Sequence, residues 1–545
     1  MPSKPRSNNP APHEQSVTID RVQPGMERKW GGAAVLETGA HTAVTRIGQT
    51  FGMNEPGKDQ TASLLTPGRN CWRVETADRF AVLMENSAFF DALRSALGRA
   101  RRSIVILGWQ FDPRTRLDPE GTDGDPRAQI GHQLLMLAKA RPDLDIRLLI
   151  WKSPLLIAAS QDFYPHRARA WFNRRMVEFR LDPPPALGAC HHQKVIIIDD
   201  AVAFCGGGDI STDRWDSEEH LDSDPRRCQP SGLIPPPRHE VMAVLDGPAA
   251  RALGDLARER WFRATGERIR ADEADGDPWP TGVQPDLRGV PVGIVRTEPS
   301  AGGRAEVREN EALHLDAIRR AKHLIYMENQ YFTSPVLAAA LAARLAEQEG
   351  PEIVLVSTGT SPSWFDRITM DTARSEVLFR LEQADRHNRF FAFTPQTRGG
   401  ARIIVHAKVS IYDDAILRIG STNLNNRSFG FDTECDVAAE PAEAAGRAAI
   451  QRFRHRTIGH WIGVSGETFG ATEAETGSVG GAIHRFDTGR MKVLGATRPS
   501  KTERIIAEFQ LGDPTSTRDA FRPWKRRSRS HRVLPGTKEP LSRNR

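Results

Sequence analysis

Two segments of this chain repeat one polar pattern at the same spacing, and this repetition constrains the fold more than any other feature. Residues 191–216 read HHQKVIIIDDAVAFCGGGDISTDRWD, and residues 405–430 read VHAKVSIYDDAILRIGSTNLNNRSFG. Each segment has a His, a Lys two residues later and an Asp five residues after the Lys, and a glycine follows seven residues after the Asp. One such motif arises easily by chance. Two copies with matching flanks indicate a duplicated domain.

The six motif residues are the candidate catalytic centre. In each copy a run of β-formers follows the Lys, at residues 195–198 and 409–412. Because side chains at i and i+2 of an extended chain share one face, we expect each His and its Lys to project together. The six positions are His192, Lys194, Asp199, His406, Lys408 and Asp413.

Helical and strand patterns alternate in the same order in both halves. The first half predicts helices at 86–101 and 129–140 and strands at 103–109 and 145–151. The second predicts helices at 311–321 and 335–347 and strands at 323–328 and 352–357. This alternation predicts an α/β fold with a parallel or mixed sheet covered on both faces by helices.

The expected organisation has five parts. A Pro- and Gly-rich segment without periodicity, residues 1–70, is expected to be disordered. The first half spans 71–267 and the second 290–462, joined by an acidic Pro- and Gly-rich linker at 268–289. Residues 463–545 are expected to be mostly irregular. They end in a basic run at 521–532. Its charge is compatible with binding to anionic lipid or nucleic acid, and equally with a solvated tail that binds no partner.

Composition narrows the class of protein. Hydrophobic residues make up 39% and charged residues 26%, as in soluble globular proteins. The N-terminus has no apolar core of a Sec signal peptide, so we expect a cytoplasmic protein, with secretion by a signal-independent route left open. The five cysteines are scattered and form no CxxC, which argues against a disulfide framework and a zinc site. We expect no metal and no cofactor.

The paired motifs resemble those of the phospholipase D superfamily, and the resemblance extends from about residue 75 to residue 460. The segments GWQFD at 108–112, RHEV at 238–241 and ENQYF at 328–332 fit its lipid-cleaving branch, closest to phospholipase D proper, although buried aromatic clusters explain the first and last equally well. The resemblance implies two similar α/β/α sandwich halves around a pseudo-two-fold axis, with one active site between them. In RHEV, Arg238 and Glu240 stand where family members often carry Trp and Asp.

The resemblance also implies roles for individual residues. His192 is expected to attack phosphorus and His406 to act as acid and base, while the two lysines neutralise the phosphate oxygens. Glu240 and Glu434 are expected to orient the imidazoles. Asp209, Ser421 and Asn423 are the candidate substrate-binding residues, and Asp199 and Asp413 fit a structural role that ties each strand to its neighbours.

The leading expectation for function is a phospholipase D that hydrolyses phosphatidylcholine or a similar lipid through a phosphohistidine, with transfer to alcohols. The alternatives are a cardiolipin-synthase-type phosphatidyltransferase, then a nuclease. The acidic stretch DSEEHLDSD at 216–224 speaks against a nucleic-acid partner. A non-enzymatic scaffold would predict decay of one motif, and both are intact. We expect peripheral contact with a phospholipid membrane, through loop 218–237 with its apolar Leu233 and Ile234, and a monomer, because one chain holds both motifs.

Overall fold

The computed structural model describes residues 62–120, 125–154, 164–172, 176–271, 276–486, 488–495, 500–502, 505, 509–510 and 512–520. All of them belong to one compact unit, Gly57–Arg545. Most of the expected disordered segment, residues 1–61, and the basic run at 521–532 lie outside the described residues. No described helix combines the length and the apolar character that crossing a bilayer requires.

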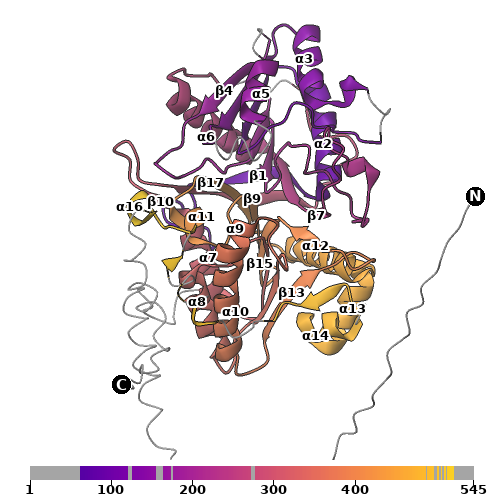
Figure 1. Ribbon diagram of the computed structural model, residues 1–545, viewed down its shortest axis with the longest axis vertical. Coiled ribbons are helices and arrows are strands. Elements are labelled where there is room, and N and C mark those ends of the chain that lie inside the picture. Colours follow the sequence, from indigo (N-terminus) through magenta and orange to yellow (C-terminus); the bar gives the residue numbers. More distant parts are fainter. Residues whose placement is uncertain are drawn as a thin grey trace, which may run out of the picture. The chain divides into compact units, whose positions relative to one another are not determined.

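The first half alternates strands and helices as the sequence predicts (Figure 1). Helix α2 begins one residue before the expected start, and β3 matches the expected strand at both ends. The principal elements are β1 (Arg73–Met84), α2 (Glu85–Arg99), β2 (Ser103–Gly108), α3 (Ile130–Ala140), β3 (Asp145–Trp151), β4 (Glu178–Asp182), β5 (Val195–Ile198), β6 (Val202–Gly206), β8 (Val241–Asp246) and α6 (Gly247–Thr265).

The second half repeats this order of elements. It contains β9 (Leu287–Glu298), α7 (Glu309–Arg320), β11 (Leu324–Asn329), α8 (Pro335–Leu345), β12 (Glu352–Val356), α10 (Thr372–Ala384), β13 (Phe390–Pro395), β15 (Lys408–Tyr412), β16 (Ile416–Gly420), β17 (Glu434–Ala439) and α12 (Ala444–Ile462). The motif strands β5 and β15 therefore occupy corresponding places, each followed by a tight hairpin to β6 or β16.

One continuous mixed sheet runs through both halves. Its order is β18-β13-β12-β11-β15-β16-β17-β9-β1-β8-β6-β5-β2-β3-β4, where the edge strand β18 is Met491–Val493. Corresponding strands of the two halves therefore lie at equal distances from the β9–β1 pair. β1 and β9 are antiparallel, with Ala77 opposite Val290. Helices cover both faces of the sheet, and the fold class is the predicted α/β with two similar halves. The sequence suggested a sheet for each half, whereas the β1–β9 ladder joins them into one.

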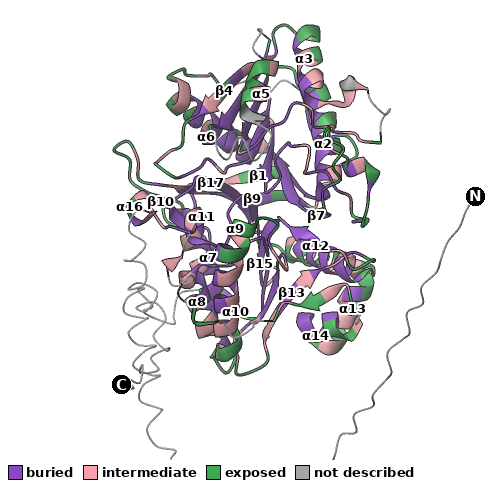
Figure 2. Ribbon diagram, viewed as in Figure 1, coloured by how far each residue is buried: buried purple, intermediate pink, exposed green. Residues whose placement is uncertain are grey.

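The strands alternate between two apolar layers. On β8, Val241, Ala243 and Leu245 belong to a cluster shared by both halves, while Met242 and Val244 face the outer core of the first half. Because both faces are buried, the strands read as continuous apolar runs. Figure 2 shows the resulting pattern, in which strands are buried and exposure is concentrated on helices and loops.

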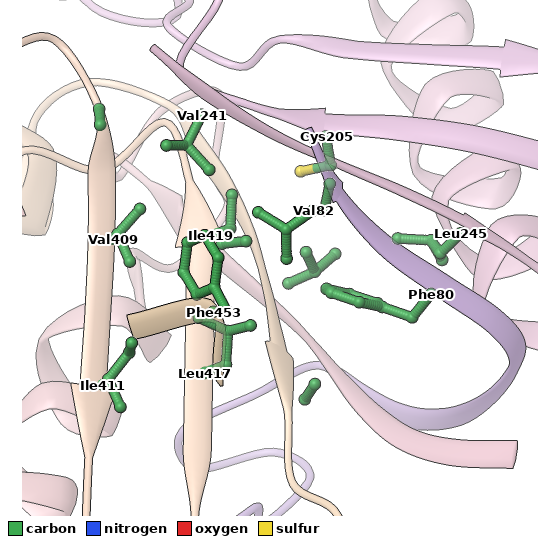
Figure 3. Packing of buried hydrophobic residues seen from close by; sticks show 14 of the residues in the cluster. Phe80, Val82, Cys205, Val241, Leu245, Val409, Ile411, Leu417, Ile419 and Phe453 are labelled. Carbon is green, nitrogen blue, oxygen red and sulfur yellow. The ribbon is translucent and has the colours of Figure 1, made fainter. Parts of the chain in front are cut away.

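The shared cluster lies between the halves. Phe80, Leu245 and Cys205 of the first half face Val409, Ile411, Leu417 and Ile419 of the second half (Figure 3). Helix α6 contributes Trp261 and α12 contributes Phe453 and Trp461, all at most 3% exposed. The halves are thus joined by core packing as well as by the sheet, which leaves little freedom for them to move as separate domains.

Regular structure extends beyond the expected boundaries at both ends. Ser63, which the sequence assigned to the disordered segment, donates a hydrogen bond to Glu440 at 2.5 Å, and Leu64 and Leu65 are buried. After Gly463, where mostly irregular chain was expected, the structure contains α13 (Gly466–Thr476), α14 (Val479–Phe486), β18 (Met491–Val493) and α16 (Thr517–Ala520). These elements are short and rich in Gly and Thr, and they persist because Phe469 and Ile483 pack into the shared core.

Candidate active site

His192 lies three residues before β5, at the edge of the sheet where that strand begins. Its backbone N–H donates to the carbonyl of Thr433, at 3.0 Å. Its ring Nδ1 lies 2.9 Å and 3.1 Å from the two carboxylate oxygens of Glu434, the first residue of β17 in the second half. The first histidine is therefore oriented by a carboxylate from the other half of the chain.

His406 has the mirrored arrangement. It precedes β15, and its backbone N–H donates to the carbonyl of His239 at 2.9 Å. Its Nδ1 lies 2.9 Å from the carboxylate of Glu240, which stands between β7 (Arg238–His239) and β8 of the first half. Glu240 and Glu434 therefore have the predicted positions, and each half supplies the carboxylate for the other half's histidine.

Gly207 allows the two motifs to approach each other. A Cβ at this position would lie 3.1 Å from the carbonyl oxygen of His406 and 3.3 Å from the side chain of Lys408. Both separations are shorter than ordinary Cβ contacts, so glycine lets the backbone of the first motif lie close to the second without displacing it. The glycine-rich stretch after Asp199 therefore has a packing role between the two motifs.

The two motif lysines are buried beside their histidines. Lys194 Nζ donates to the carbonyl of His192 at 2.9 Å, and Lys408 Nζ donates to the carbonyl of His406 at 2.6 Å. Lys408 Nζ also lies 3.1 Å from His406 Nδ1. Two cationic groups at one buried site attract an anion, and a phosphodiester has the charge and size to fit this role.

Asp199 and Asp413 stand away from the histidines, at the far ends of their strands. Asp199 accepts hydrogen bonds from the backbone N–H groups of residues 101, 102 and 103, at 2.7 to 2.9 Å. Asp413 accepts from residues 322, 323 and 324, at 2.7 to 2.8 Å. Both have left-handed backbones, with φ of 55° and 52°. They fasten the hairpin to the neighbouring strand, which is the structural role expected for them, and the structure does not bring them to the histidines.

Two of the candidate substrate-binding residues already form hydrogen bonds or ion pairs with other residues of the protein. Asp209 lies 3.3 Å from Lys194 Nζ and accepts hydrogen bonds from the backbone amides of Trp109 and Gln110. Ser421 Oγ donates to Glu434 at 2.5 Å. The geometry therefore favours a supporting role for both residues, because a carboxylate repels an anionic substrate and the hydroxyl proton is already donated.

Asn423 is the remaining candidate. Its side-chain oxygen is buried and has no hydrogen-bond partner among the described residues. A buried amide without a partner is unusual, which is consistent with a group reserved for a ligand.

Burial shifts the protonation of the site. Desolvation, together with Lys194 and Lys408, lowers the pKa of His192 well below its usual value. Desolvation and Lys408 lower the pKa of His406 in the same way. Burial also lowers the pKa of Lys408 to about 7, although Glu240 opposes this shift. Both imidazoles are therefore neutral, and the hydrogen bonds through Nδ1 leave each Nε2 with its lone pair.

The sequence analysis missed the cationic wall around His406. Arg214 and Arg238 each contribute to the low pKa of His406, and Arg214 Nη1 lies 3.8 Å from Glu240. Of the two, the sequence analysis names only Arg238, as a departure from the family pattern. Both are well buried, with side chains 8% and 11% exposed. They lie in or at the end of the long connection between β6 and β8, whose path local patterns do not predict.

A buried ion-pair network contacts the backbone of Glu240, whose N–H donates to Glu85 at 3.3 Å. His239 lies 2.5 Å from Glu85 and 2.9 Å from Glu328 of the second half, and Trp461 Nε1 donates to Glu328 at 3.2 Å. Against the desolvation that burial imposes, Glu85 and Glu328 raise the pKa of His239 to about 10. Glu328 of the ENQYF segment therefore joins the halves electrostatically.

One group of described residues has the composition of a cation site. Ligand atoms of Glu85, His220 and His460 lie within 4.8 Å of one another. Glu85 is already paired with His239 and His220, and His220 Nδ1 lies 2.9 Å from Asp216. A cation would have to displace these ion pairs, so the donor set does not favour a metal.

Comparison with known proteins places this site in a family. The family model described as "Cardiolipin synthase, PLD-like domain" matches residues 314–456, which contain the second motif. Cardiolipin synthase A of Pseudomonas putida strain GB-1 is 29% identical over 366 residues, covering 65% of this chain and 63% of that protein. Phospholipase D alpha 3 of Arabidopsis thaliana is 23% identical, covering 66% of this chain and 60% of that protein. The chain thus spans less than two thirds of the length of these relatives.

The structure also aligns with a crystal structure of phosphatidylserine synthase from Haemophilus influenzae. The alignment covers 86% of this chain and 97% of the synthase chain, with 11% sequence identity and a TM-score of 0.49. That likeness is too distant to bear on function. The matched sequences and the crossed pairs of His192 with Glu434 and His406 with Glu240 identify the family. The chain belongs to the phospholipase D superfamily.

Proposed function

We propose that this protein transfers phosphatidyl groups between alcohols at the His192–His406 site, as a phosphatidyltransferase of the cardiolipin-synthase type. The observation that carries the proposal is the crossed pairing, in which two histidine–carboxylate pairs and two lysines converge from both halves. Relatives named cardiolipin synthase A and the matched family model support a lipid substrate. The sequence analysis put hydrolysis of phosphatidylcholine first, and these relatives favour its alternative.

In the first step, the phosphate oxygens of the donor lipid bind between Lys194 and Lys408. Nε2 of His192 attacks phosphorus, forming a P–N bond as the bond to the headgroup oxygen breaks. The anionic phosphodiester offsets the two lysines, which favours a protonated His406 within the complex. His406 donates that proton to the departing alkoxide, and Glu240 stabilises the imidazolium that precedes it.

In the second step, the hydroxyl of the acceptor occupies the place of the released alcohol. Neutral His406 takes the hydroxyl proton while the oxygen attacks phosphorus, and the P–N bond to His192 breaks. Glu434 keeps Nδ1 of His192 protonated throughout, so that Nε2 remains the reacting atom. The cycle returns every proton to its starting place and needs no cofactor.

Hydrolysis is the second candidate, with water as the acceptor in the same second step. The match to a phospholipase D of Arabidopsis thaliana and the ENQYF segment favour it. The two functions differ only in which hydroxyl reaches the phosphohistidine first.

Product analysis separates the two candidates. The protein is incubated with phosphatidylglycerol vesicles, and lipids and glycerol are quantified. Transfer predicts cardiolipin and glycerol, whereas hydrolysis predicts phosphatidic acid and glycerol. Phosphatidylcholine with ethanol provides a second test, because a transferable intermediate yields phosphatidylethanol. If neither phosphatidylglycerol nor phosphatidylcholine yields a product, under conditions in which a reference enzyme acts on both, the proposal is refuted.

The roles of the two histidines are tested with a p-nitrophenyl phosphodiester, whose leaving group needs little protonation. We expect His406→Ala to form a covalent phosphohistidine that intact-mass spectrometry detects, and His192→Ala to form none. With phospholipid, both variants should lose about 10²–10⁴-fold in turnover. The matched control is His387→Ala, at an exposed position, which should retain activity.

A further inference from the structure

The largest exposed apolar side chains of the second half gather on one short helical segment. Trp364 is 66% exposed, Phe365 50% and Ile368 45%. The segment comprises α9 (Trp364–Asp366) and the π-helical turn η3 (Arg367–Asp371), which leads into α10. Ile368 lies four residues after Trp364 and three after Phe365, spacings that share a helix face, and the rings of Trp364 and Phe365 lie 6.3 Å apart between centroids, so the three side chains form a single patch. In Figure 2, α9 is drawn mainly in the colour of exposed residues.

Strand register places the patch beside the active site. β11 runs antiparallel to β15, with Asn329 opposite Lys408, so the carboxyl end of β11 meets the start of the motif strand. β12 is parallel to β11, and its carboxyl end therefore lies at the same edge of the sheet. The chain that leaves this end of β12 carries the patch.

Direct contacts fix this placement. Thr358 Oγ1 donates to the carbonyl of Val405 at 3.1 Å and accepts its N–H at 3.0 Å, one residue before His406. Tyr331 of the ENQYF segment donates its hydroxyl hydrogen to Asp366 at 3.2 Å, in the middle of the patch segment. The patch is thus held at the rim of the site by both the strand before His406 and the segment after β11.

A second apolar pair approaches the same edge from the first half. The connection from β6 to β8 starts next to Lys194 in the hairpin and returns at Glu240, so both of its ends lie at the site. Within it, Leu233 is 62% exposed and Ile234 39%. Exposed apolar side chains therefore occur in both halves on connections that leave the active-site edge.

We propose that Trp364, Phe365 and Ile368 insert into the surface of a phospholipid bilayer and hold the active-site edge against it. This inference rests on the proposed function, because a lipid donor reaches His192 and His406 only from a bilayer or as a monomer. Trp and Phe favour the interfacial zone of a bilayer, and the exposed Arg367 beside them suits anionic headgroups.

The test compares the wild type with the triple variant Trp364→Ala, Phe365→Ala, Ile368→Ala. Binding of the full chain to vesicles of equimolar phosphatidylglycerol and phosphatidylcholine is measured by sedimentation. We expect the variant to bind at least about tenfold more weakly. The control Met136→Ala, Met176→Ala removes two exposed apolar side chains of the first half, one on α3 and one just before β4, which begins at the opposite edge of the sheet, and should bind as the wild type does.

Turnover distinguishes failure of this inference from failure of the proposed function. With dihexanoyl phosphatidylglycerol kept monomeric, the triple variant should retain wild-type kcat/KM, and on vesicles its rate should fall about tenfold or more. Equal vesicle binding by variant and wild type, or no binding by either, would overturn the membrane role whatever the activity. A change of oligomeric state in the variant, with unchanged vesicle binding, would assign the patch to a protein contact and would also overturn it. Patch-dependent binding without turnover of any lipid would support the membrane role while refuting the proposed reaction.

Discussion

At the scale of single residues, the crossed histidine–carboxylate pairs are alike in geometry and different in surroundings. Glu434 accepts a hydrogen bond from Ser421, whereas the corresponding residue of the first motif is Gly207, which has no hydroxyl to offer Glu240. Glu240 has Arg214 nearby instead. A carboxylate held by a neutral donor and one held among cations stabilise an adjacent imidazolium to different extents. This asymmetry is a physical reason for the two histidines to have different roles.

Replacing either carboxylate by an amide is expected to lower turnover while the fold is retained. Glu434→Gln and Glu240→Gln each keep the shape of the side chain but remove the charge that fixes the Nδ1–H tautomer. We expect a loss of about 10²–10⁴-fold in kcat for each variant. Glu306→Gln makes the same chemical change at an exposed position and should have no effect. Wild-type turnover in both site variants would contradict the assigned pairing.

Anion binding is expected to weaken as the pH rises through about 7. Burial lowers the pKa of Lys408 to about 7, so its ammonium is charged below that pH and neutral above it. The pKa values of His192 and His406 lie well below their usual range, so neither ring titrates there. Calorimetric titration with dimethyl phosphate, a monoanion at every pH used, should show more proton uptake at pH 8 than at pH 6, because Lys408 then takes up a proton in addition to any that His406 gains in the complex. Lys408→Arg should remove this dependence, and its persistence in that variant would assign the titration to another group.

At the scale of secondary structure elements, the two β-hairpins depend on the aspartates that end their first strands. Asp413→Ala removes the acceptor of three backbone N–H groups and places alanine in a left-handed conformation. We expect this variant to lose about 2–4 kcal/mol of unfolding free energy, measured by denaturant titration. Asp413→Asn tolerates the backbone and keeps one acceptor, so its loss should be about half as large.

Activity measurements complete this test. Each folded Asp413 variant should turn over substrate within about twofold of the wild type, because the carboxylate does not contact the histidines. Asp143→Ala, at an exposed position, is the control for stability. Loss of turnover in Asp413→Asn without loss of stability would return this aspartate to the catalytic machinery.

At the scale of the whole molecule, the shared core predicts that both halves unfold together. The central cluster combines side chains of both halves with those of α6 and α12, and the sheet is continuous through β1 and β9. Differential scanning calorimetry should therefore show one transition for the body of the protein. Phe453→Ala should lower that single transition, with a cost of about 3–5 kcal/mol, rather than split it. Two separate peaks would indicate that each half is an independent domain.

The sequence by itself determined the duplication, the α/β class, the order of elements and six motif positions. These features follow from local patterns, because strand and helix periodicity and motif spacing are properties of short segments. The carboxylates Glu240 and Glu434 also followed from the motifs, with help from the family resemblance. The sequence could not separate Asp199 and Asp413 from the catalytic group by spacing alone.

Only the tertiary structure decided which residues meet. It paired each histidine with the carboxylate of the other half, engaged Asp209 and Ser421 within the protein, and brought Arg214 and Arg238 to His406. It joined two expected sheets into one through β1 and β9, and it placed Trp364 at the catalytic edge. These outcomes depend on contacts between residues far apart in the chain. No local pattern encodes such contacts, because they are set by the packing of whole strands and helices against one another.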